Sequence, residues 1–272
     1  MTSRQESVAS DQPHPDDERL VGADRVLAVL VELAGHPDGV TLDELAQTLN
    51  GTKPTIHRAL VSLRKAGLAD QIGRGHYLLG DEFLRLAFRN HEARPDATRI
   101  EPLLRALADE FGETAHYAVL NGTDVVYRAK VDPPAGAIRL TSTIGGRNPA
   151  YRTAVGKALL SRSITSEAAL RDWLGTTTLE RRTPRTLTTV PALFEDLARS
   201  RDRGYAVDDQ ENEASVNCVA IPVHLSGSAM PTGAVSVSGL TFRTPLATLV
   251  EAVPRIRAMI EEHLGTGACG PL

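Results

Sequence analysis

Basic and hydroxyl side chains gather in one short stretch of this chain. Residues 52–78 hold five lysine and arginine side chains against one acid, although the chain as a whole has a net charge of -4. Positive charge is therefore concentrated where the phosphates of a nucleic acid would lie. The side chains that we expect to face DNA are Thr52, Lys53, Thr55, His57, Arg58, Arg64 and Arg74.

The same region has the spacing of two short helices joined by a tight turn. Thr41 and Glu44 form a capping box at the start of the first helix, and Asn50-Gly51 is suited to its end. Pro54 lies in the first turn of the second helix, where its missing N–H is not needed. Apolar residues recur at helical spacing in both segments. This is the helix-turn-helix layout, in which the second helix enters the major groove.

A hairpin is expected directly after the second helix. Residues 68–72 and 76–79 have the composition of two strands, and Gly73-Arg74-Gly75 lies between them. A hairpin in this place is the wing of a winged helix, and Arg74 at its tip would reach the DNA backbone or minor groove. The alternative is an ordinary helical hairpin with a solvated basic face.

A second group of candidate binding residues lies in the C-terminal half. The run Thr153-Ala154-Val155-Gly156 stands at a loop-to-helix junction, where unpaired N–H groups favour an anion such as a carboxylate. Its glycine would let the backbone approach a ligand closely. Ser236 and Ser238 share one side of a strand, and Cys218 begins an apolar one. These residues predict a pocket for a small acid; the alternatives are a space-filling cysteine and a polar sheet face.

A cysteine-dependent enzyme is the rival interpretation, with Cys218 paired to His116 or His224. His224 is six residues further along the same strand, about 20 Å away, and no nucleophile elbow is present. The acidic run at 208–213 has no His or Cys at ligand spacing, so we expect a solvated loop there. The residues around Gly156-Lys157 do not complete a phosphate-binding loop. No catalytic residue, metal or cofactor is predicted.

The order of the elements predicts about two domains in 272 residues. We expect a disordered tail at 1–19, a DNA-binding domain at 20–80, a linker helix at 81–95, an effector-binding and oligomerisation domain at 96–265 and a tail at 266–272. In the C-terminal domain, strands are expected at 116–120, 124–131, 137–143, 205–208, 217–224 and 233–238. Helices are expected at 96–111, 154–161, 166–174, 190–203 and 246–264. Strands interleaved with segregated helices indicate an α+β domain.

Composition excludes other classes of protein. No apolar run approaches the roughly 18 residues of a membrane span, and the polar N-terminus lacks the core of a secretory signal. Two cysteines do not make a disulfide framework. We therefore expect a cytoplasmic protein with no membrane partner.

Short stretches along the chain match a known family in their order and spacing. They are Ala23–Leu27, the helix pair within 45–68, Thr153–Ala158, Arg203–Asp208, Cys218–Val223 and Ser236–Ser238. The chain therefore resembles the IclR family of bacterial transcriptional regulators over nearly its whole length. The resemblance implies an N-terminal winged helix-turn-helix domain and a C-terminal effector domain related to the GAF and PAS sensor folds.

The resemblance also extends the candidate sites and names the partners. It adds Arg25 to the DNA-binding residues, and Asp208 and Val216 to the effector-binding residues around Cys218. It implies dimers, often paired as tetramers, that act as repressors or activators, and small organic or aromatic acids as effectors. We expect a repressor on a near-palindromic double-stranded operator. The alternative is a DNA-binding protein whose C-terminal domain only oligomerises.

Overall fold

The computed structural model describes residues 22–73, 75–92, 95–133, 140–225, 228 and 230–270. The chain forms two compact units that divide between Ala93 and Arg94. Each unit has its own hydrophobic core. The tail predicted at 1–19 lies outside the described residues.

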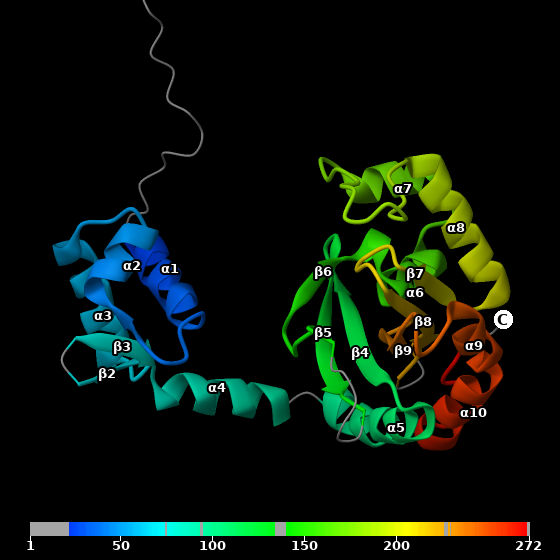
Figure 1. Cartoon of the computed structure of the whole chain (residues 1–272), viewed down its shortest axis with the longest axis horizontal. Coiled ribbons are helices and arrows are strands. Elements are labelled where there is room, and N and C mark those ends of the chain that lie inside the picture. The colour runs from blue at the N-terminus through cyan, green and yellow to red at the C-terminus, as the bar shows by residue number, and fades with distance from the viewer. Residues whose placement is uncertain are drawn as a thin grey trace, which may run out of the picture. The chain divides into compact units, whose positions relative to one another are not determined.

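The first unit is a winged helix-turn-helix (Figure 1). Its three strands form an antiparallel sheet in the order β1-β3-β2. This confirms the fold class predicted for the N-terminal part of the chain. Its elements are α1 (Ala23–Leu33), β1 (Val40–Thr41), α2 (Leu42–Thr48), α3 (Lys53–Lys65), β2 (Ala69–Ile72), β3 (His76–Leu79) and α4 (Asp81–Glu92).

Local sequence signals set the ends of the helices in this unit. The Thr41 hydroxyl accepts the Glu44 amide and the Glu44 carboxylate accepts the Thr41 amide, so the predicted capping box is present. Asn50 takes the left-handed conformation, with φ of 47°, in the turn between α2 and α3. Four apolar side chains of α3, those of Ile56, Ala59, Leu60 and Leu63, are buried in the core of this unit, whereas Val61 is exposed. Strand β1 was not predicted, because two residues are too short to show an alternating pattern.

Helix α4 closes the first unit and carries apolar side chains that are not covered. Leu84, Leu86 and Phe88 are exposed to 51%, 46% and 64%. Leu84 and Phe88 are four residues apart and therefore share one face of the helix. On α1, Leu27 and Val31 are likewise four residues apart and exposed.

The second unit is built on an antiparallel sheet of six strands in the order β6-β5-β4-β9-β8-β7 (Figure 1). The strands are β4 (Thr114–Asn121), β5 (Asp124–Val131), β6 (Arg147–Pro149), β7 (Ala206–Asp209), β8 (Val216–Val223) and β9 (Gly233–Leu240). The helices are α5 (Pro95–Phe111), a 3-10 turn at Ala150–Arg152, α6 (Ala154–Ser163), α7 (Glu167–Leu174), α8 (Val190–Arg203), α9 (Leu246–Glu251) and α10 (Val253–Leu264).

The sheet separates two cores, and the two-residue period of the strands decides which side chain enters which core. Val219 and Val237 pack with α5, α9 and α10 on one side. Cys218 and Ala220 pack with α6, α7 and α8 on the other. Several strand side chains on the second side are small, among them Cys218, Ser236 and Ser238, and a space remains between the sheet and the start of α6. This position holds the cavity described below.

Two predicted elements of this unit are wrong. A strand was predicted at 137–143, but residues 140–143 are not a strand, and 137–139 lie outside the described residues. The strand next to β5 is instead Arg147–Pro149, which was not predicted because it is three residues long and contains a proline. The single helix predicted at 246–264 is two helices, α9 and α10, that meet at Ala252. Pro254 is the second residue of α10 and has no N–H to continue the hydrogen bonding of α9.

Candidate functional site

Helix α3 presents most of the predicted DNA-facing side chains to solvent. Lys53, His57, Arg58 and Arg64 are exposed, whereas Ile56, Ala59, Leu60 and Leu63 are buried. A helix with one buried apolar face and one exposed basic face is what a recognition helix requires.

Several of these predicted DNA-facing side chains form an ion pair or a hydrogen bond with a neighbouring side chain. Lys53 Nζ lies 2.8 Å from the carboxylate of Asp43 at the start of α2. Arg64 donates to the Gln71 side chain on β2, at 3.0 Å, and so connects α3 to the wing. Thr52 occupies the N-cap position of α3, but its hydroxyl bonds the Thr55 hydroxyl rather than a backbone amide.

The remaining DNA-binding candidates lie beside α3. Arg25 on α1 lines a shallow groove together with Thr55, Arg58 and Ser62. Arg74 lies outside the described residues. The glycines on either side of it have φ of 55° and 94°, conformations that suit a three-residue hairpin loop.

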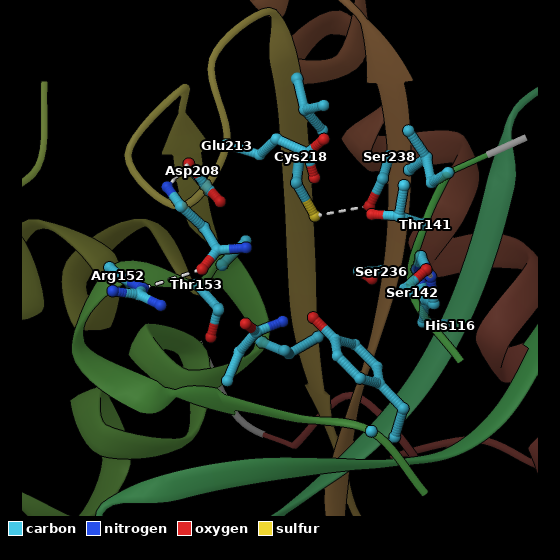
Figure 2. A pocket seen from close by; sticks show the side chains of 18 of the residues that line it. His116, Thr141, Ser142, Arg152, Thr153, Asp208, Glu213, Cys218, Ser236 and Ser238 are labelled. Carbon is cyan, nitrogen blue, oxygen red and sulfur yellow. Dashed lines mark hydrogen bonds between the residues drawn. The ribbon is translucent and has the colours of Figure 1, made fainter. Parts of the chain in front are cut away.

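A cavity of about 290 Å³ lies between the sheet and the start of α6 in the second unit (Figure 2). Most of the predicted effector-binding residues line it. These are Thr153, Ala154, Val155, Asp208, Val216, Cys218, Ser236 and Ser238. Other groups on its wall were not predicted as effector contacts, and these include His116, Tyr127, Ser142, Arg147, Arg152, Arg182, Asn212 and Glu213.

Strand register explains why residues far apart in the chain meet on the floor of this cavity. Asp208 is opposite Cys218, and Cys218 is opposite Ser238, so that β7, β8 and β9 each give one side chain to a row. In the next row on the same face, Ser236 is opposite His116 of β4. The two rows form a continuous polar floor.

The start of α6 closes the cavity from the other side. The Thr153 hydroxyl accepts the Gly156 amide, and the Thr153 carbonyl accepts the Lys157 amide. The amides of Ala154 and Val155 are in the first turn of α6 and have no partner within that helix, and both residues line the cavity. N–H groups at a helix N-terminus attract an anion.

Gly156 does not line the cavity, unlike the three residues before it. A Cβ atom on Gly156 would lie 2.1 Å from the Ala150 carbonyl oxygen. The glycine therefore permits close packing of α6 on the preceding turn. The backbone of Gly156 therefore makes its close approach to the Ala150 carbonyl of the same chain, and not to a ligand as we expected.

Cys218 is a buried thiol on the cavity floor, and its Sγ donates to the Val219 carbonyl at 3.6 Å. The Ser238 hydroxyl donates to Cys218 Sγ at 3.0 Å (Figure 2). Burial raises the pKa of Cys218 to about 12. A thiol in this state is a poor nucleophile.

The geometry also separates Cys218 from the histidines of the enzyme hypothesis. His116 lies two strands away, since β9 stands between β8 and β4. His116 Nε2 is 2.8 Å from the Ser142 hydroxyl. His224 follows the end of β8 and its Nδ1 is 3.0 Å from the Ser228 carbonyl.

The acidic run at 208–213 is not the solvated loop that we predicted. Asp208 and Glu211 are buried. Asp208 Oδ1 accepts the amides of Glu211 and Asn212, and burial raises the pKa of Asp208 to about 7. Glu211 forms an ion pair with Lys157 of α6. The prediction was wrong because the sequence did not show that a lysine would be buried opposite the run.

Charge around the cavity is mixed, with more basic groups at its rim. Arg147, Arg152 and Arg182 line it, against Asp208 and Glu213. Arg152 donates to the Asn212 side chain at 2.9 Å. Because α6 begins at Ala154, Arg152 also lies next to the start of that helix. In the described part of the chain no cluster of three His, Cys, Asp or Glu side chains is arranged to hold a metal ion.

Two family matches cover both units. Residues 22–73 match the IclR helix-turn-helix domain, and residues 95–262 match the bacterial transcriptional regulator IclR C-terminal domain. The chain belongs to the IclR family. Members of the IclR family are transcriptional regulators, so this chain is a DNA-binding regulator and not an enzyme.

Individual IclR-family proteins agree with this assignment. The transcriptional repressor IclR of Escherichia coli (strain K12) is 32% identical over 219 residues, which are 79% of this chain and 78% of that protein. A putative transcriptional regulator from Rhodococcus sp. RHA1 matches in structure with a TM-score of 0.74 and 27% identity, over 89% of this chain and 97% of that one.

A third relative carries a ligand. The inducer-binding domain of a PobR double mutant from Acinetobacter, solved with 3-hydroxybenzoic acid, matches with a TM-score of 0.56 and 27% identity. The match covers 61% of this chain and 95% of that one.

Among the described residues of our IclR-family chain, no helix is long and apolar enough to cross a membrane.

Proposed function

We propose that this IclR-family regulator is a cytoplasmic repressor whose affinity for its operator is set by a small organic acid. The observation that carries the proposal is the cavity that the first turn of α6 and the polar floor of the sheet line together. The acid bound to the PobR domain supports it, as does the repressor activity in the name of the Escherichia coli relative.

The carboxylate of the effector lies at the start of α6. The amides of Ala154 and Val155 donate to it, and the nearby Arg152 adds positive charge. Ser238 turns its hydroxyl proton from Cys218 to the ligand, and Ser236 lies on the same face of β9. The cavity lining supports Thr153, Asp208 and Val216 as further contacts, while Gly156 acts only by letting α6 pack.

The DNA site is the exposed face of α3 with its neighbours. Lys53, Thr55, His57 and Arg58 face the major groove. Arg25, Thr52, Arg64 and Arg74 contact phosphates or the adjacent groove. Removing a base contact costs about 1 to 3 kcal/mol and relaxes specificity, whereas removing a phosphate contact weakens all sequences alike.

One winged helix offers few contacts, so the active form is at least a dimer on a near-palindromic operator. The uncovered apolar side chains of α1 and α4 are candidates for the surface between subunits. Light scattering on Leu84→Glu/Phe88→Glu, with Glu101→Ala as a control, tests this. A double variant with the wild-type mass would remove α4 from the interface.

A thermal-shift screen of small organic acids on the full chain tests the effector. An acid at a hundred times its Kd stabilises the domain that binds it by about 2.7 kcal/mol. Ser238→Ala should weaken that acid by about 1.5 to 3 kcal/mol and leave operator affinity unchanged. Loss of operator affinity with unchanged acid binding would place the serine in the fold rather than the site.

The operator is obtained by selecting sequences from a random DNA pool with the full chain. Regulation then requires that the acid bind the DNA-free and DNA-bound forms with different affinity, typically by about 1 to 3 kcal/mol. Arg58→Ala should lose operator binding without loss of acid binding. An acid that binds but leaves operator affinity unchanged would contradict control by the effector.

A further inference from the structure

Three arginine side chains lie close together at the surface of the second unit, away from the cavity. Arg162 is in the last turn of α6, Arg201 is in the last turn of α8, and Arg257 is in α10 (Figure 1). Each of the three is partly exposed, and none of them lines the cavity. Arg162 is about 12 Å along α6 from its first residue, so this arginine cluster is separate from the proposed effector site.

Two of these arginines bind backbone carbonyls at the ends of helices. Arg201 donates from Nε to the Ser161 carbonyl at 2.8 Å and from Nη2 to the Ile164 carbonyl, which places its guanidinium against the end of α6. Arg257 donates from Nη2 to the Gly204 carbonyl at the end of α8. A cation is favourable in such a position, because the C-terminus of a helix carries about half an elementary negative charge. These contacts offset part of the charge of the two arginines.

Arg162 has no such partner. Among the described residues its guanidinium forms no hydrogen bond and no ion pair; Nε and Nη2 are buried, whereas Nη1 keeps accessible surface. Burial and the charges of Arg257 and Arg201 lower the pKa of the Arg162 guanidinium. A partly buried cation that has two cations beside it and no partner is unfavourable, so an anion that reaches Nη1 would be stabilised there.

The charge that remains on the cluster indicates the class of anion. Three guanidinium groups against two helix ends leave about two positive charges. In the part of the chain that the structure describes, the ion pairs between arginine and carboxylate groups all belong to other arginines. A guanidinium presents its N–H groups as a planar fork that matches the oxygens of a phosphate. A phosphate dianion therefore suits the cluster better than a single carboxylate.

We propose that Arg162, Arg201 and Arg257 form a second anion site, which binds inorganic phosphate or the phosphoryl group of a small metabolite. The Nη1 atoms of the three arginines have no partner among the described residues and donate to the phosphate oxygens. Because the arginines are at the surface, the remainder of a phosphorylated molecule stays in solvent. The site does not require an acid in the cavity, so its failure would leave the proposed function standing.

Titration calorimetry on the full chain at constant ionic strength tests the inference, with sodium phosphate and glycerol 3-phosphate as the probes. At least one of them should bind with a Kd below about 1 mM. Binding of phosphate alone would identify the free ion as the ligand, and comparable binding of glycerol 3-phosphate would identify a phosphoryl group; either result supports the site. A Kd above about 1 mM for both probes would indicate an adventitious ion only and overturn the inference.

The variant Arg162→Gln removes the arginine that has no partner. It should weaken the bound probe about tenfold or more, as the loss of one hydrogen bond to a charged group does. Arg171→Gln is the matched control, because it removes one exposed positive charge from α7 and should change the affinity less than about twofold. Wild-type affinity in Arg162→Gln would assign the anion to another part of the chain, such as the DNA-binding surface, and overturn the inference.

Thermal unfolding gives a second readout, which separates a ligand site from a structural role. Removing a cation that has no partner should not destabilise the fold, so Arg162→Gln without phosphate should have a Tm at or above that of the wild type. Phosphate should raise the Tm of the wild type and of Arg171→Gln, but not that of Arg162→Gln. A lower Tm of Arg162→Gln without phosphate, or an equal response to phosphate, would assign Arg162 to the fold and overturn the inference.

Discussion

Lys157 Nζ lies 2.8 Å from the carboxylate of Asp196, and the Lys157 side chain has no exposed surface. Glu211 completes the cluster, so one buried cation connects α6, α8 and the loop after β7. A single side chain therefore joins three chain segments, of which α6 and the loop after β7 line the cavity.

We expect Lys157→Met to destabilise the C-terminal unit strongly. Removing the cation leaves the buried Glu211 carboxylate without its partner and Asp196 with only the exposed Arg199, and breaking a buried ion pair in this way costs about 3 to 5 kcal/mol. Urea unfolding measures the loss. The control is Arg171→Ala, whose ion pair with Glu167 is exposed and should contribute less than about 1 kcal/mol. Similar losses in both variants would mean that the buried cluster has no special role.

Asp208 should make the stability of the second unit depend on pH. Its folded pKa is about 7, above the ordinary 3.8, because burial favours the neutral acid. The folded state therefore holds the proton longer, and its stability falls as pH rises from about 4 through 7. Asp208→Asn mimics the neutral acid and should lose this dependence.

The measurable quantity is the free energy of unfolding of Asp208→Asn minus that of the wild type. It should rise with pH between about 4 and 7, by at most about 1.4 kcal/mol per pH unit, and then level off. The opposing titration of His116 and the parallel one of Glu211 occur in both proteins and largely cancel. Parallel pH profiles would show that Asp208 is ionised throughout.

Gly156→Ala should destabilise the packing of α6 against its neighbours. It should not remove a ligand contact. The new Cβ would meet the Ala150 carbonyl oxygen, and such overpacking costs about 1 to 3 kcal/mol or more. Ser163→Ala, at an exposed position of the same helix, is the control and should change stability by less than about 0.5 kcal/mol. Thermal unfolding followed by circular dichroism measures the change in stability of Gly156→Ala and of Ser163→Ala.

Asp43→Asn should tighten DNA binding. Asp43 pairs with Lys53 and brings negative charge next to the recognition helix. Its removal releases the lysine for phosphate, with a gain below about 1 kcal/mol that grows as salt is lowered. Fluorescence anisotropy at several salt concentrations measures this. Asp109→Asn, an exposed change on α5 in the other unit, should have no effect.

Local signals let the sequence predict most of the fold. The capping box at Thr41, the turn at Asn50-Gly51 and the glycines of the wing each require nearby residues only. Alternating strands after residue 114 could be recognised for the same reason. The strand at Arg147–Pro149 was missed, because its proline and short length hide the pattern.

The candidate site was predictable only in part. Ser236, Ser238 and the start of α6 carry their own signals, in alternation and in the loop-to-helix junction. His116 was considered only as a partner for Cys218, because its place beside Ser236 depends on the pairing of β4 with β9 across more than a hundred residues. No local pattern contains that register. The same holds for Lys157, whose two acidic partners come from different elements.

Both cysteines of the chain are enclosed, Cys218 in the sheet floor and Cys269 near the end of the described residues. Burial raises the pKa of each thiol, to about 12 and about 11. An alkylating reagent can therefore modify them only when the surrounding structure opens. The rate of modification of each thiol therefore reports local opening of the native protein around that thiol. A molecule bound on the floor of the cavity would lower the rate at Cys218 alone.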